Sequence, residues 1–367
     1  MVDVLLQTLV FLTGAFIVIS TIQAAIRSFV LPRNEAVLIS NVVFALSRYL
    51  FDAIAALGRS FRQRDRVMAL FAPVSLVALP IVWLGLVSAG YTLMFWALGE
   101  GDWWWCYKLS NNALLTLGSE KSDNVWSSAL SYSEAALGLL LMTLLISYLP
   151  TIYQAFSKRE LTVARLELRA GSGHSSVKLI QWLNRTGSLH DDAEQWLSWE
   201  EWFVELEESH TSLPIISFFR SPQPGRSWIT AAGLILETAA LIKSSITQPH
   251  DPHMELCFEA GCQSLTRIWR FFQVRMQATP PVLVKHPDPV EDPTYQAFRR
   301  ARTELAEAGI AVTADEKTAW EEFQQLRSRY HEALDFLARL TMAPDLHSVD
   351  NQEDKSDRKD PVRDQQK

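Results

Sequence analysis

The chain has 367 residues, of which 48% are hydrophobic, and a formal net charge of −7 from 34 basic and 41 acidic side chains. Because charges of both signs are mixed along the chain, no basic face for nucleic-acid phosphate is evident, and nucleic-acid binding is not expected. Three cysteines are too few for a disulfide framework, which excludes the small disulfide-stapled domains.

Three long apolar segments predict transmembrane helices. The first, residues 4–26, contains no charged residue, and no Lys or Arg precedes it, so a cleaved signal peptide is not favoured. The second is residues 67–99, and the third is residues 135–156, extended outward to residue 125. Each is long enough for a hydrocarbon core, which needs about 20 apolar residues.

The charges between these segments predict their orientation. Residues 27–66 carry seven arginines and three acids, whereas residues 100–123 carry four acids and two lysines. By the positive-inside rule the N-terminus lies outside, the first loop inside and the C-terminal half in the cytoplasm. Residues 36–57 include Arg48 and Asp52, which favours a helix in the cytoplasmic interface over a fourth span.

The outer loop between the second and third segments is unusual. Residues 103–105 are three tryptophans, which suit a membrane interface, and residues 110–115 predict a short helix followed by Gly118. Non-helical backbone lies at membrane depth only where protein or a water-filled cavity satisfies its polar groups. We therefore expect a re-entrant hairpin that lines a pore.

The order of span, short helix, Thr116-Leu117-Gly118 and span resembles the pore domains of potassium channels, and more narrowly the bacterial two-helix pore proteins of the ion-channel family. Tyr107 and the Thr-Leu-Gly triplet match their loop. Residues 147–160 (Ser-Tyr-Leu-Pro-Thr-Ile-Tyr-Gln-Ala-Phe-Ser-Lys-Arg-Glu) match the end of their inner helix, and the resemblance covers residues 67–172 well.

The resemblance implies an integral protein of the bacterial inner (plasma) membrane, with the lipid bilayer as its surroundings. It implies a homotetramer, or an assembly with a related subunit, because each chain supplies one pore loop and the filter needs four. The transported ion would be a monovalent cation such as potassium, and no cofactor is expected. The filter positions would be Thr116, Leu117, Gly118, Ser119 and Glu120.

The chain departs from this family within the filter. The family reads T-V-G-Y-G or T-L-G-F/Y-G, whereas Ser119 and Glu120 here replace the aromatic residue and the second glycine. A non-glycine residue in the left-handed conformation costs about 1–2 kcal/mol, so the outer half of the filter is not expected to form as in the family. Two functions follow: a cation pore with a ring of Glu120 carboxylates, or a non-conducting pseudo-channel that anchors or scaffolds its cytoplasmic half.

Two positions of the third segment are candidates to support the pore. Glu134 lies about two helical turns inside the segment, where it either braces the pore helix through Ser110 or Asn112, or reaches water at the outer interface. Gly138 is either a hinge of the inner helix or a site of close helix packing.

The C-terminal half predicts an all-α cytoplasmic domain. Trp196, Trp199 and Trp202 recur at helical spacing beside acidic residues, which indicates one buried and one solvated face. Residues 229–246 are apolar but contain Glu237 and Lys243, so a core helix is preferred to a span. Helical runs are expected at residues 161–170, 175–186, 191–208, 227–246, 252–276, 293–308 and 314–341.

Neither an enzyme nor a metal site is expected. The sequence contains no nucleophile-elbow, phosphate-loop or dinucleotide motif. His250, His253, Cys257 and Cys262 are metal-ligand types, but their spacing is not that of paired zinc ligands, and the segment reads as an amphipathic helix with buried cysteines.

The expected fold class is an all-α membrane protein with three transmembrane helices, a re-entrant pore helix and an all-α cytoplasmic domain. The tail is expected to be disordered because it is rich in charge and has no large aromatic residue. In chain order the parts are residues 1–66 (first transmembrane helix and interfacial helix), 67–160 (pore domain, with outer helix 67–99, pore loop 102–123 and inner helix 125–156), 161–344 (cytoplasmic domain) and 345–367 (tail).

Overall fold

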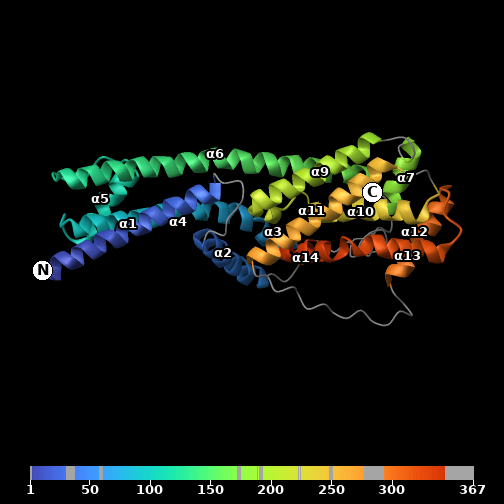
Figure 1. Cartoon of the computed structure of the whole chain (residues 1–367), viewed down its shortest axis with the longest axis horizontal. Helices are drawn as coiled ribbons and strands as arrows, with labels where there is room; N and C mark the ends of the chain where they lie inside the picture. The colour runs from blue at the N-terminus through green and yellow to red at the C-terminus, as the bar shows by residue number, and fades with distance from the viewer. Residues whose placement is uncertain are drawn as a thin grey trace, which may run out of the picture. The chain divides into compact units, whose positions relative to one another are not determined.

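The computed structural model describes residues 2–29, 38–57, 61–171, 175–187, 189, 193–221, 223, 225–247, 251–276 and 293–343. Over these residues the chain is helical, without strands, apart from one isolated antiparallel bridge between Ile246 and Val312 (Figure 1). The all-α prediction is confirmed for this part of the chain. The tail at 345–367 and His250 lie outside the described residues.

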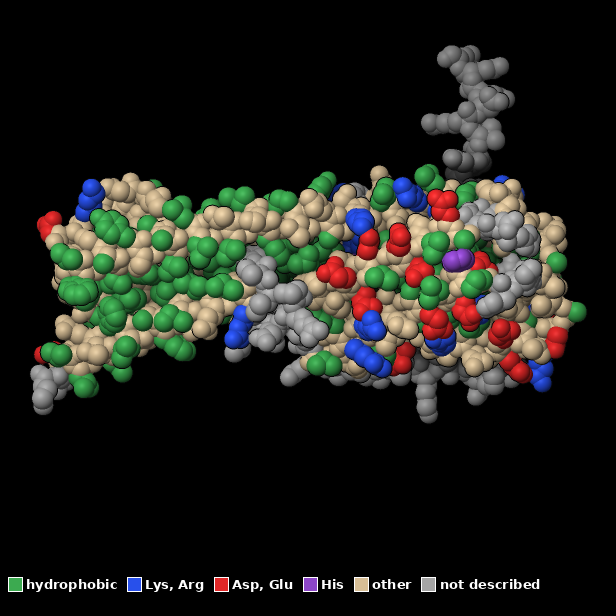
Figure 2. Space-filling model, turned by 45° about the horizontal axis from the view of Figure 1, so that its top comes forward, with side chains coloured by type: hydrophobic (Ala, Val, Ile, Leu, Met, Phe, Trp, Pro, Cys, Tyr) green, Lys and Arg blue, Asp and Glu red, His purple; other side chains and the backbone are tan. Residues whose placement is uncertain are grey.

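The described residues divide into two compact units. The first unit is Met1–Gln154 with Ser212–Phe219, and the second unit is Ala155–Thr211 with Arg220–Lys367. Space-filling colours show charged side chains concentrated on the second unit and hydrophobic ones over the first (Figure 2).

Three helices are long and apolar enough to cross a membrane, as the sequence predicts. They are α1 (Val2–Phe29), α4 (Phe71–Ala97) and α6 (Val125–Ala170). Helix α6 runs without interruption for 46 residues, so the expected separation between an inner helix ending at 156 and a run at 161–170 is wrong. The reason is local, because residues 157–170 contain no Gly or Pro that would end a helix.

Helices α2 (Leu38–Ala56) and α3 (Phe61–Ala69) precede α4. The sequence predicts a second transmembrane helix that begins at residue 67, but residues 67–69 belong to α3, and α4 starts after Leu70. Pro73 falls in the first turn of α4, where a backbone N–H has no partner within the helix, whereas Pro80 lies in its interior.

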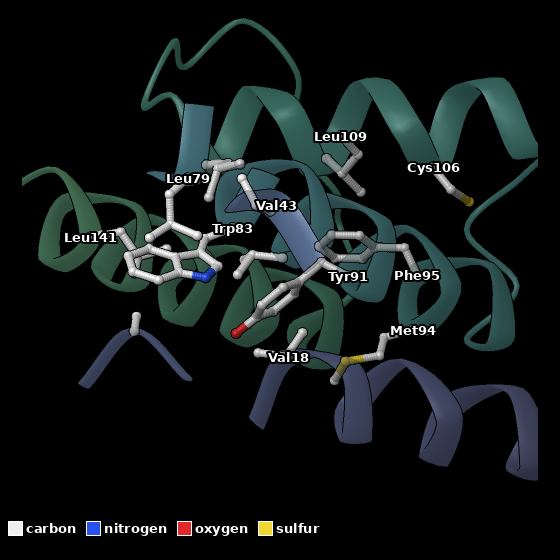
Figure 3. Close-up of a cluster of buried hydrophobic side chains, with 13 residues drawn as sticks. Val18, Val43, Leu79, Trp83, Tyr91, Met94, Phe95, Cys106, Leu109 and Leu141 are labelled. Atoms are coloured by element: carbon white, nitrogen blue, oxygen red, sulfur yellow. The ribbon is translucent and has the colours of Figure 1, made fainter. Parts of the chain in front are cut away.

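The core of the first unit forms where α1, α2, α4, α5 (Trp103–Leu114) and α6 meet (Figure 3). Helices α1 and α4 approach very closely, since a Cβ atom on Gly14 would stand 2.4 Å from the carbonyl oxygen of Gly90. Small residues permit such close contact between apolar helices. Buried side chains of this core include Val18, Val43, Trp83, Phe95, Leu109 and Leu141.

A short segment from later in the chain completes the first unit. The 3₁₀ helix η1 (Pro214–Phe218) packs on α4, and the rings of Phe71 and Phe218 meet edge to face with centroids 5.5 Å apart. The guanidinium of Arg48 on α2 lies 5.7 Å from each ring centroid and donates to the carboxylate of Asp52 at 3.0 Å. Cation–π contact of this kind favours arginine at position 48.

The described part of the second unit consists of the end of α6 and helices of 11 to 25 residues, and its buried residues include Trp196, Trp199 and Trp202. The helix expected at 314–341 is in fact two helices, because the chain turns at Arg329 and Tyr330. The remaining bounds are α7 (Ser176–Thr186), α9 (Ala193–Ser212), α10 (Trp228–Ser245), α11 (Pro252–Met276), α12 (Pro293–Glu307), α13 (Glu316–Ser328) and α14 (His331–Thr341).

Candidate functional site

Helix α5 lies between α4 and the first half of α6 and is the centre of the candidate site (Figure 1). The side chain of Asp102 caps it by accepting a hydrogen bond from the backbone N–H of Trp105 at 3.0 Å. Because of this cap, the helix begins at Trp103, well before the start expected at 110. The apolar face of α5 is buried and is formed by Cys106, Leu109 and Leu114.

The chain turns sharply after α5. Thr116 has a φ of 54° and Gly118 a φ of 75°, both in the left-handed region. A left-handed threonine is uncommon because its branched side chain clashes with the backbone, so the surrounding bonds must hold it. The N–H of Leu117 donates to the carbonyl of Asn112 at 2.9 Å.

The side chain of Asn112 closes this turn. Its Nδ2 donates to Ser119 Oγ at 2.8 Å, and its Oδ1 accepts from the N–H of Ser119 at 3.1 Å. Asn112 is buried, whereas Leu115 and Leu117 at the tip are 55% and 67% exposed. Of the five expected filter positions, Ser119 is thus tied to α5, and no hydrogen bond or ion pair among the described residues engages Glu120.

Glu134 on α6 is buried against α5. Its Oε1 lies 2.6 Å from Ser110 Oγ, within hydrogen-bond distance, and the residue has no exposed surface. The interpretation of Glu134 as an interfacial residue that reaches water is therefore wrong. The structure brings Ser110 and Glu134 together, as the brace requires, but Asn112 contacts Ser119 instead.

Ser88 on α4 is a further member of this group. Ser110 Oγ lies 3.0 Å from the Ser88 carbonyl oxygen and 3.3 Å from Ser88 Oγ. Tyr91, one turn later, shares a hydrogen bond with Ser133 of α6 at 2.8 Å. Sequence reasoning missed both, although two polar residues one turn apart in an uncharged span are a detectable signal.

Gly138 lies where α6 crosses the end of α5. A Cβ atom there would stand 2.3 Å from the carbonyl oxygen of Leu114, which is too close for any side chain. Helix α6 is continuous through this position. The packing interpretation of Gly138 therefore has a direct structural basis.

The exposed surface of α6 is mostly apolar, with a narrow polar row. Thr143, Ser147, Thr151 and Gln154 are all exposed and recur at helical spacing on one side. The hydroxyls of Thr143 and Ser147 donate to carbonyls one turn earlier, each at 2.8 Å. Sequence reasoning missed this row, which its spacing of three to four residues could have revealed.

No group of three or more His, Cys, Asp or Glu side chains that could hold a metal ion occurs in the part of the chain that the structure describes. No family model, curated protein or solved structure matches the chain. The function is therefore inferred from the geometry.

In the second unit, a buried histidine contacts the continuation of α6. His210 Nδ1 lies 2.8 Å from the carbonyl oxygen of Leu206, so this nitrogen carries the hydrogen, and Nε2 faces the Arg159 guanidinium at 3.4 Å. Burial and the charge of Arg159 hold the pKa of His210 well below its usual value. Trp228 packs on the imidazole with centroids 4.5 Å apart.

Proposed function

We propose that the chain is a pore-forming subunit that conducts cations, with potassium as the expected ion, across a bacterial plasma membrane. In this proposal α1, α4 and α6 cross the bilayer, α5 is a re-entrant helix at its outer side, and the second unit lies in the cytoplasm. Four copies would surround one pore, because each chain supplies a single loop.

The observation that carries the proposal is the hairpin made by α5 and the turn at residues 115–119. A capped helix of 12 residues is too short to span a bilayer, and it lies between two helices that are long enough to do so. Its turn exposes Leu115, Leu117 and Gly118, as expected for a surface completed by other copies.

The polar row on α6 supports the same arrangement. The hydroxyls of Thr143 and Ser147 already donate to backbone carbonyls, but their oxygens and the amide of Gln154 can still bind water or another polar helix, which hydrocarbon does not offer. If the row of Thr143, Ser147, Thr151 and Gln154 faces the pore axis, the apolar positions of α6 face lipid and neighbouring copies.

The test is ion flux through the purified full-length protein in liposomes, with potassium, rubidium and sodium gradients. Glu120→Gln removes the carboxylate expected at the pore entrance, so flux or selectivity should change. Asp123→Asn is the matched control, because it removes an exposed acid three residues further along the same loop. Absence of flux for every ion, with the protein inserted and assembled, would contradict conduction.

A second candidate, a non-conducting scaffold, is favoured by one specific observation. Both polar groups of the Asn112 side chain bind Ser119, so the residues after Gly118 fold back on α5. The double variant Ser119→Tyr/Glu120→Gly restores the family's pattern. Potassium-selective flux in this variant alone would indicate an otherwise intact pore. Absence of flux in the variant as well would favour the scaffold.

A further inference from the structure

Glu134 has no positively charged partner in the part of the chain that the structure describes. Residues 4–26 of α1, the whole of α4 and residues 125–157 of α6 contain no charged side chain other than Glu134. Helix α5 contains only Lys108, which is exposed and lies 5.7 Å from the ring of Trp104. A buried carboxylate without a positive partner is unfavourable, and such groups usually become neutral by taking up a proton.

The second carboxyl oxygen adds an independent observation. Glu134 Oε2 is buried and has no hydrogen-bond partner among the described residues. An ionised carboxylate distributes its charge over both oxygens, so an unpaired Oε2 would leave part of a negative charge unsolvated. In a carboxylic acid the same atom is a neutral carbonyl oxygen, and leaving it unpaired costs less.

The hydrogen bonds around Ser110 can be counted. Its single hydroxyl hydrogen faces two short contacts, to Glu134 Oε1 at 2.6 Å and to the Ser88 carbonyl oxygen at 3.0 Å. If Glu134 is ionised, both neighbours only accept, and one contact lacks a hydrogen. If Glu134 carries a proton on Oε1, it donates to Ser110, and Ser110 donates to Ser88, so both contacts are satisfied.

We propose that Glu134 is a proton-binding site, and that its proton fastens α6 to α5 and α5 to α4 through the chain Glu134, Ser110, Ser88. Loss of the proton leaves the hydroxyl hydrogen of Ser110 facing two acceptors, Glu134 Oε1 and the Ser88 carbonyl oxygen, so one of these two hydrogen bonds is lost and the chain is weakened. Protonation of Glu134 therefore strengthens the attachment of α5 to α4 and α6. This effect rests on the hydrogen bonds of the first unit and does not require that the protein conducts ions.

The titratable neighbours of the site do not supply a positive charge. Helix α4 presents Tyr91, whose hydroxyl is bonded to Ser133 of α6, and α5 presents the buried thiol of Cys106 one turn before Ser110 (Figure 3). Neither group is cationic in any protonation state.

The test is an infrared difference spectrum of the purified full chain at pH 7, wild type minus Glu134→Gln. Exposed glutamates are ionised at this pH, because their ordinary pKa is about 4.3, so they give no carboxylic-acid carbonyl band. The proposal expects such a band in the wild type and its loss in Glu134→Gln. The matched control, Glu120→Gln, should retain the band.

A second variant keeps the test decisive if Glu134→Gln does not fold. Ser110→Ala removes the acceptor of the acid proton, so the acid band should shift in frequency. A wild-type spectrum without an acid band, or a band that neither substitution alters, would overturn the proposal. Since the readout is the protonation of one side chain, a failure of ion flux would leave it unaffected.

Discussion

The carbonyl oxygen of Leu114 lies 2.3 Å from the point where a Cβ atom on Gly138 would stand. We therefore expect Gly138→Ala to push α6 away from the end of α5 and to destabilise the first unit by about 1–3 kcal/mol, the usual cost of overpacking. The Leu114 carbonyl belongs to the backbone, so it cannot rotate away from the new methyl group as a flexible side chain could. Thermal unfolding of the full chain in detergent measures the effect.

The matched control is Gly85→Ala on α4. A Cβ atom at Gly85 meets nothing within 4 Å, and the residue lies inside a helix. Alanine there should be neutral or stabilising by up to about 1 kcal/mol, because alanine is the better helix former. Equal effects of the two substitutions would contradict the close contact of α5 and α6.

The turn after α5 should loosen in steps as its bonds are removed. Asn112→Ala deletes both hydrogen bonds to Ser119, whereas Ser119→Ala deletes only the one that reaches its hydroxyl. Each net hydrogen bond contributes about 0.5–1.5 kcal/mol, so Asn112→Ala should increase amide hydrogen exchange at residues 115–120 more than Ser119→Ala does. Identical exchange in both variants would show that the Asn112 side chain does not hold the turn.

The sequence predicts the three membrane-length helices because each is a long apolar run, a signal that depends on local composition alone. It does not predict that α5 starts at Trp103. This start depends on the carboxylate of Asp102, which caps the helix, and an aspartate can be identified as a cap only once the helix that follows it is known. A contact from Glu134 to the pore helix is one of the two alternatives that the sequence leaves open. That Glu134 contacts Ser110, and that Ser110 in turn contacts Ser88, depends on how α4, α5 and α6 pack together. No local sequence pattern encodes this packing.

The stability of the second unit should fall as the solution is acidified. His210 is buried and neutral, and its pKa is held well below the usual value of about 6.5 by burial and by Arg159. Below about pH 6.5 the unfolded chain therefore binds a proton that the folded chain does not. The free energy of unfolding should be unaffected above that pH and decline by up to about 1.4 kcal/mol per pH unit below it, until the folded pKa is reached.

Denaturation between pH 8 and pH 5, followed by tryptophan fluorescence, tests this dependence. His210→Gln cannot titrate and should show a shallower decline than the wild type. His253→Gln is the control, because His253 is a partly buried histidine on another helix of the same unit. If the wild type and His210→Gln decline in parallel, the buried imidazole is not the source of the pH dependence.

The polar row on α6 gives a prediction that separates a water-filled pore from a lipid-facing surface. Ser147 belongs to the row, whereas its neighbour Ile146 is an apolar residue that is 68% exposed. A membrane-impermeant cationic thiol reagent should modify Ser147→Cys in liposomes at least about tenfold faster than Ile146→Cys, because the reactive thiolate forms in water and not in hydrocarbon. The three native cysteines are buried, so the background in the wild type should be low. Equally slow modification would place both positions away from water and favour the scaffold, and equally fast modification would contradict a lipid-embedded α6.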